Sequence, residues 1–241
     1  MTPSAPNGER HQEAIATCEV VEHTIIMLQS DRQTFERFRD GATASEAVMT
    51  THFPPAIARW YSQTMLNGLR RLDDRDERSH SLWRLFHGMI RYPDDWTFDA
   101  VFALWRQAGT ICNRDPEMLE FLAGATYEWA ADSSGRALSV ARVKADRDKL
   151  VEIIKGARHV VNKTIAHADR KASAATMTFK ELHDAIYAVE DLAKRYIALV
   201  TGRGYSLEPG SMTPVEQTPW HRIFEPWRTL DRRSYKPRDL C

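Results

Sequence analysis

Apolar residues recur at intervals of three and four positions through the middle of the chain, a spacing that predicts amphipathic helices. Capping residues and prolines mark the starts of five helices, at Pro54, Ser81, Thr97, Asp115 and Thr178. The first should run to about Asp73 and the second should end at Pro93. The fourth should reach about Ala131, and Thr201-Gly202 should end the fifth. No stretch alternates with period two for long enough to predict a strand, so the predicted fold class is all-α.

A further helix is predicted in the basic segment 136–171. On a helical wheel, seven residues fall within about 60° of one line and form an apolar seam: Leu150, Ile154, Ala157, Val161, Thr164, Ile165 and Ala168. Cationic residues such as Lys149 and Lys163 lie away from that line. This pattern is typical of a surface helix that packs in a bundle.

The distribution of proline divides the chain into two parts. Five of the 11 prolines fall after residue 208, which excludes a long helix there. We therefore expect a helical bundle over residues 10–204 and a Pro-rich C-terminal arm over 205–241. The arm is rich in aromatic residues, unlike a disordered linker, and its Trp220 and Trp227 are expected to be buried against the bundle.

The formal net charge of zero, from 33 basic and 33 acidic residues, conceals an uneven distribution. Residues 93–135 contain eight acids and two bases, a net charge of −6. Residues 136–171 contain ten bases and four acids, a net charge of +6. The two segments complement each other in packing, are simply solvated, or provide a local site for a polyanion.

Several classes of protein are excluded by what the sequence lacks. Its longest apolar run is six residues, over 100–105, which is too short to span a bilayer. The first eight residues contain no secretory signal, and three widely spaced cysteines predict reduced thiols in a cytoplasmic protein. Glu19 and His23 share a helix face but have no third ligand, so neither a metal site nor a cofactor is expected.

The segment 161–169, Val-Asn-Lys-Thr-Ile-Ala-His-Ala-Asp, resembles the signature of HEPN domains. These are small α-helical bundles, many of which are metal-independent ribonucleases. Their pattern is an Arg, usually a polar residue next, and a His four to six positions further on. Asn162 matches the polar residue, His167 matches the histidine, and Ala166–Asp169 matches a common ending of the motif.

A second segment, residues 65–85, is similar to the AbiU-like branch of that family, which belongs to abortive-infection systems. In these proteins an apolar helix ends at an Asp, here Asp73, and a Ser-Leu pair opens the next helix, here at Ser81. The resemblance covers roughly residues 10–202. It implies a four-helix core with extra N-terminal helices and a role in prokaryotic toxin–antitoxin or phage-defence systems.

The resemblance also implies roles for particular residues. His167 would act as general base on a ribose 2′-hydroxyl, Asn162 would orient the group, and the product would be a cyclic phosphate. The Arg that stabilises the phosphorane charge in the family is replaced here by Val161. Lys163 and Arg170 lie 40° and 60° from His167 on the wheel, and are the candidates to replace it.

Three further residues are binding candidates: Lys155, Arg158 and Asp169. A continuous helix would place Arg158 on the face opposite His167, since the two are nine residues apart.

The partners that the resemblance implies are a second copy of the chain, RNA, and an antitoxin or nucleotidyltransferase. In a homodimer the missing cation could come from the second chain. Two functions remain open: a metal-independent endoribonuclease, and an inactive HEPN-like module that dimerises or binds a protein or nucleotide.

Overall fold

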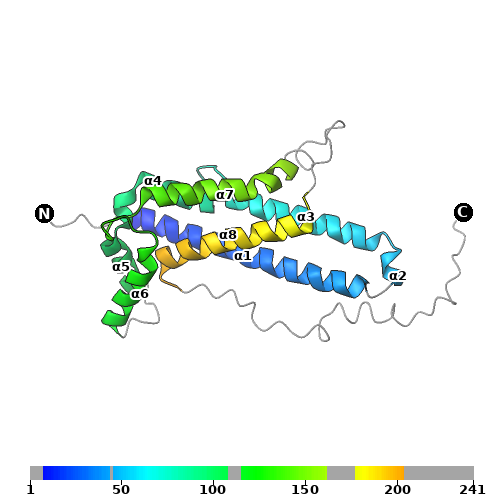
Figure 1. The fold of residues 1–241 in the computed structure, drawn as a ribbon, viewed down its shortest axis with the longest axis horizontal. Helices are drawn as coiled ribbons and strands as arrows, with labels where there is room; N and C mark the ends of the chain where they lie inside the picture. The colour runs from blue at the N-terminus through cyan, green and yellow to red at the C-terminus, as the bar shows by residue number, and fades with distance from the viewer. Residues whose placement is uncertain (1–7, 44–45, 108–114, 162–176, 204–241) are drawn as a thin grey trace, which may run out of the picture.

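The computed structural model describes residues 8–43, 46–107, 115–161 and 177–203, and these residues form an all-α fold (Figure 1). The α-helices are α1 (Gly8–Thr43), α2 (Glu46–Met49), α3 (Phe53–Leu72), α4 (Leu82–Arg91), α5 (Phe98–Gln107), α6 (Pro116–Glu128), α7 (Val140–Val160) and α8 (Phe179–Thr201). A short 3-10 helix, η1, covers Pro93–Trp96. Within the described residues, β pairing is limited to one isolated bridge between Ala131 and Leu138. The predicted fold class is confirmed.

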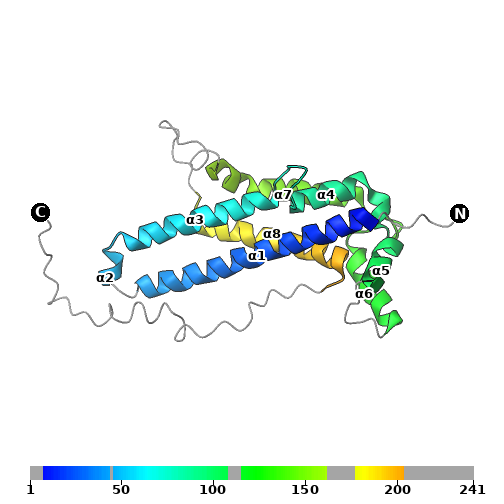
Figure 2. The same ribbon diagram turned by 180° about the vertical axis from the view of Figure 1, so that it is seen from behind.

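Four long helices build the bundle. Helix α1 packs against α3 and α8, and α7 packs against the same two helices from the other side. Figures 1 and 2 show α1 running antiparallel to α3 and α8, with α4 beside α7 and with α5 and α6 at one end. The sequence predicts N-terminal helices in addition to a four-helix core. In the structure α1 is a continuous helix of 36 residues and is itself one of the four.

The predicted helix caps are confirmed where they can be compared. The Ser81 hydroxyl accepts a hydrogen bond from the Arg84 amide at 3.1 Å, and Thr178 forms a capping box with Glu181. Helix α6 ends at Glu128, three residues before the predicted end at Ala131. The chain turns there because the carbonyl oxygen of Tyr127 accepts hydrogen bonds from the backbone amides of Ala130 and Ala131. A tight loop then brings Leu138 back beside Ala131.

Three large tyrosines are almost completely buried in the core, and each hydroxyl has a hydrogen-bond partner. The Tyr127 hydroxyl donates to the carbonyl oxygen of Trp96 at 2.7 Å, and the Tyr196 hydroxyl donates to Asp146 at 2.8 Å. The hydroxyl of Tyr61 lies 2.7 Å from His183. These bonds satisfy polar atoms that burial would otherwise leave unpaired.

The apolar seam of α7 is confirmed as far as the structure describes it. Leu150, Ile154, Ala157 and Val161 are each at most 1% exposed. The remaining seam residues lie outside the described residues, as do Trp220, Trp227 and the rest of the arm at 205–241.

Two glycines permit close contacts between elements. A Cβ on Gly68, in α3, would lie 2.6 Å from the side chain of Leu28 in α1. Gly202 ends α8 with a positive φ of 65°, and a Cβ there would lie 2.7 Å from the indole of Trp105. The same indole donates to the carbonyl oxygen of Leu199 at 3.0 Å, so α5 is joined to the end of α8. Among the described helices, none is long and apolar enough to cross a membrane.

Candidate functional site

An open groove of about 990 Å³ lies where α1, the C-terminal half of α3 and the end of α7 meet. The charged residues of one wall are four arginines and two aspartates: Arg70, Arg71, Asp73, Asp74, Arg75 and Arg158. The opposite wall comes from α1 and includes His23, Met27 and Asp31. The groove therefore has an arginine-rich wall in a protein whose formal net charge is zero.

Asp73 and Arg158 form the buried part of this wall. Asp73 follows the last residue of α3, and its side chain is 1% exposed. Arg158 forms an ion pair with the Asp73 carboxylate and also donates to the Asp73 carbonyl oxygen at 3.4 Å. Burial of a carboxylate is costly unless a cation accompanies it, so this pair holds the Arg158 side chain in place.

Arg75 reaches the same carboxylate from the loop after α3. Its Nε atom is 3.7 Å from Asp73 Oδ1, and its guanidinium lies over the ring of Trp83 at 5.5 Å. The loop itself is fixed by Ser81, whose buried hydroxyl donates to the carbonyl oxygen of Asp74 at 2.6 Å. Both arginines on Asp73 are thus positioned by elements of the segment 65–85.

The other groove arginines are open to solvent. Arg70 and Arg71 are exposed in the last turn of α3, where cations also interact favourably with the helix dipole. Helix α3 contains three arginines and no acidic residue. Across the groove, burial raises the pKa of Asp31 above its ordinary value.

The predicted site residues fall into two groups. Asn162, Lys163, His167, Asp169 and Arg170 lie outside the described residues. Of the two that are described, Arg158 lines the groove, whereas Lys155 is exposed and pairs with Glu152 at 3.1 Å. Lys155 does not line this groove.

Val161 is 1% exposed and continues the core seam of α7. It stands where the motif that segment 161–169 resembles has an arginine. An arginine side chain at this position would start from the apolar core, whereas Arg158, three residues earlier, reaches the groove. Sequence reasoning included Arg158 among the binding candidates, but it did not identify Asp73 as its partner.

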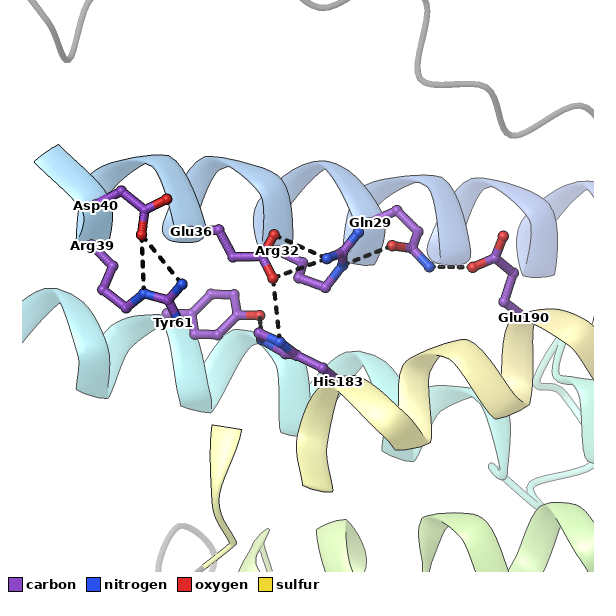
Figure 3. Close-up of polar contacts among 8 residues, drawn as sticks. All are labelled: Gln29, Arg32, Glu36, Arg39, Asp40, Tyr61, His183 and Glu190. Carbon is purple, nitrogen blue, oxygen red and sulfur yellow. Dashed lines mark hydrogen bonds and ion pairs between the residues drawn. The ribbon is translucent and has the colours of Figure 1, made fainter. Parts of the chain in front are cut away.

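A second cluster of polar residues lies between α1, α3 and α8 (Figure 3). His183 Nδ1 is 3.5 Å from Glu36 Oε1, and His183 Nε2 is 2.7 Å from the Tyr61 hydroxyl. Arg32 binds both carboxylate oxygens of Glu36 at 3.0 Å. The order carboxylate, imidazole, hydroxyl is also the order of groups in a nucleophilic triad.

The environment of this cluster does not suit nucleophilic chemistry. Tyr61 is 1% exposed, and burial raises the pKa of its hydroxyl above the ordinary value. Burial, with a contribution from Arg32, lowers the pKa of His183 below 6.5. A neutral imidazole that accepts from Tyr61 and donates toward Glu36 fits these contacts. The cluster joins three helices and presents no hydroxyl to a substrate.

The same polar layer continues along α1. Gln29 donates to Glu190 of α8 and accepts from Arg32 Nε at 3.0 Å, while Lys194 pairs with Glu190 at 2.6 Å. Because every buried polar atom here needs its partner, the layer fixes how α1 and α8 pair along their length. No sequence motif signals it, since its members are far apart in the chain.

Within the described residues, no three His, Cys, Asp or Glu side chains come together in a way that could hold a metal ion. Cys18 is fully buried, and burial raises the pKa of its thiol, so it is not a reactive cysteine. Comparison of the chain with protein-family models, curated proteins and solved structures finds no match.

Proposed function

We propose that this protein acts on RNA as a HEPN-type, metal-independent endoribonuclease in a prokaryotic toxin–antitoxin or phage-defence system. The proposal rests on the resemblance of segments 65–85 and 161–169 to that family. The structural observation that best supports the proposal is the position of Arg158. Its guanidinium is held by a buried carboxylate on the wall of an open groove. Asp73, which positions that cation, and Arg75, which pairs with the same carboxylate, belong to the first of the two segments.

The reaction follows from the roles that the resemblance implies. His167 removes the proton from a ribose 2′-hydroxyl, and the 2′-oxygen attacks the adjacent phosphorus. The bond from phosphorus to the 5′-oxygen breaks, that oxygen takes up a proton, and a 2′,3′-cyclic phosphate remains. Asn162 orients the reacting group, and Lys163 or Arg170 stabilises the developing negative charge.

In this proposal the groove binds the RNA substrate and does not supply the catalytic groups. Arg70, Arg71 and Arg158 offer guanidinium groups, which match the geometry of phosphate oxygens better than ammonium groups do. Most of the affinity for RNA should therefore come from contacts with the phosphate backbone and should fall as salt is raised.

The second candidate function is a non-catalytic HEPN-like module that dimerises or binds a protein or nucleotide. One observation favours it: Val161 is buried in the core seam, so the position of the family's arginine has a structural role here. The two candidates differ in whether RNA is cleaved.

The deciding experiment is an RNA-cleavage assay of the wild type and the His167→Ala variant, with and without a metal chelator. We expect cleavage that resists the chelator and falls by at least about 100-fold in the variant. Binding of RNA without cleavage would favour the non-catalytic module. A wild type that binds no RNA at low salt would overturn the proposal.

A matched pair of variants tests the groove. Arg71→Ala should weaken RNA binding and reduce the slope of log affinity against log salt by about 1. Lys155→Ala removes an equally exposed cation that lies outside the groove, and it should leave that slope unchanged.

A further inference from the structure

The outer face of α6 presents an apolar strip to solvent. Met118, Phe121 and Leu122 are 48%, 70% and 38% exposed, and Ala125 is exposed one turn further on. Their spacing of i, i+3, i+4 and i+7 places them along one side of the helix. Phe121 is the most exposed of the large apolar side chains in the described residues.

An acidic strip runs beside this apolar strip. Glu117, Glu120 and Glu128 are exposed on the adjoining face, and residues 115–128 contain no Lys or Arg. Next to them is an open groove of about 600 Å³ between α6 and the loop that follows it. Gly124 lines the groove, and a Cβ there would meet no atom within 4 Å. The surface thus combines apolar contact, negative charge and space for a chain.

A different exposed apolar surface lies on α2 and the first half of α3. Met49, Phe53 and Trp60 are 48%, 45% and 58% exposed. Helix α3 has arginines and no acidic residue, so a basic segment would be repelled there and attracted to α6.

We propose that the C-terminal arm of the same chain docks on α6, with its aromatic residues on the apolar strip and its basic residues along the acidic strip. In the arm, four large apolar residues lie within eight positions, at Trp220, Ile223, Phe224 and Trp227. Residues 220–241 contain six Lys or Arg against three Asp or Glu, a net charge of +3. Both features complement the strip on α6.

The arm also begins close to α6. Helix α8 ends at Thr201, where it packs against α5 and α6, and Trp105 of α5 lies against Gly202. Trp220 lies 17 residues beyond Arg203, and that length of extended chain spans up to about 55 Å. Helix α6 is about 20 Å long, so the arm reaches every part of it.

Photocrosslinking in the full-length chain tests the contact. Benzoylphenylalanine placed at Phe121, a highly exposed position, should crosslink to residues 218–230 of the same chain. The same photocrosslinker at Trp60 is the matched control, and it should give no crosslink to the arm. The double variant Glu117→Lys, Glu120→Lys should reduce the yield at Phe121 by at least about threefold, whereas Glu77→Lys on the α3–α4 loop should not.

Each alternative occupant gives a distinct result. Crosslinks from Phe121 to residues 108–114, to a second copy of the chain, or to no residue at all would overturn the proposal. Equal crosslinking of the arm from Trp60 and Phe121 would also overturn it, because contact would then lack a preferred surface. Hydrogen exchange gives an independent readout: Trp220→Ser with Trp227→Ser should speed exchange in α6 and leave α3 unchanged.

Discussion

Arg158, near the end of α7, forms an ion pair with Asp73, the residue that follows α3. The carboxylate is 1% exposed and the guanidinium side chain is 33% exposed, so one partner faces the core while the other faces the groove. The two residues are 85 positions apart in the sequence. One contact therefore fixes the packing of α7 on α3 and at the same time holds a cation at the candidate RNA-binding surface.

Arg158→Met should lower the free energy of unfolding by about 3 kcal/mol, because it leaves the Asp73 carboxylate buried without its main cation. Lys155→Met is the matched control on the same helix. Its ion pair with Glu152 is exposed, and its loss should change stability by less than about 1 kcal/mol. Chemical denaturation of the three proteins measures both values.

The origin of that loss can be tested by removing both charges. Asp73→Leu combined with Arg158→Met should be more stable than Arg158→Met alone, since no unpaired charge stays in the core. A double variant as unstable as the sum of the two single variants would mean that the two side chains do not interact.

Gly68→Ala and Gly88→Ala should change stability in opposite directions, although both glycines lie in helices. A methyl group on Gly68 would press on the buried Leu28 side chain, which should cost about 1 to 3 kcal/mol. At Gly88 the added methyl meets no atom within 4 Å, and the higher helix propensity of Ala should stabilise by about 0.5 to 1 kcal/mol. Thermal unfolding of the two variants checks the signs, and destabilisation of equal size in both would contradict the role of Leu28.

Local features of the fold could be predicted because their causes are local. The capping box at Thr178, the N-cap at Asp115 and the seam through Leu150 and Ile154 depend on residues within one or two turns of each other. The end of α6 was predicted three residues too late. It depends on the return of Leu138 to Ala131, a contact outside the helix.

The polar contacts between helices could not be predicted in the same way. Tyr61 and His183 are 122 positions apart, and no spacing rule connects them. Their pairing follows from how α3 and α8 pack, which depends on many apolar contacts together. The same holds for Asp73 and Arg158. The sequence places Asp73 in the segment 65–85 and Arg158 in the basic segment 136–171. Only the packing of α7 on α3 brings the two side chains into contact.

The histidine between Tyr61 and Glu36 should make the protein less stable in mild acid. In the folded state, burial lowers the pKa of His183 below 6.5, the ordinary value that it regains on unfolding. Below pH 6.5 the unfolded chain therefore binds a proton that the folded protein does not, and the free energy of unfolding falls with pH. We expect the melting temperature to fall from about pH 7.5 to about pH 5.5, and to fall less in His183→Asn.

A second histidine needs its own control in that experiment. Burial, aided by Arg84 and Arg91, also lowers the pKa of His87. His87→Asn should therefore remove a separate part of the pH dependence, and the double variant should remove both parts. If His183→Asn leaves the pH dependence unchanged, the imidazole is not neutral and buried in the way that its contacts with Tyr61 and Glu36 indicate.

Val161→Arg introduces the residue type that HEPN ribonucleases carry before the polar residue of the motif that segment 161–169 resembles. The structure predicts a cost for this change, because Val161 is 1% exposed and belongs to the core seam of α7. An arginine there brings a charge into the core, and the free energy of unfolding should fall by about 3 kcal/mol or more. His159→Arg, an exposed position on the same turn, is the control and should change stability by less than about 0.5 kcal/mol.

The activity of a Val161→Arg variant that still folds distinguishes a site that lacks only the arginine from a site that lacks further catalytic groups. Chelator-resistant RNA cleavage that rises in this variant, and is lost when His167→Ala is added, would mean that the arginine was the missing group. A folded variant without activity would mean that more than one catalytic group has been lost. If the wild type already cleaves RNA, Val161 does not limit the reaction, and Lys163→Ala and Arg170→Ala become the tests of which cation stabilises the phosphorane. Circular dichroism and cleavage should therefore be measured on the same preparations, since loss of activity through unfolding would carry no information about the chemistry.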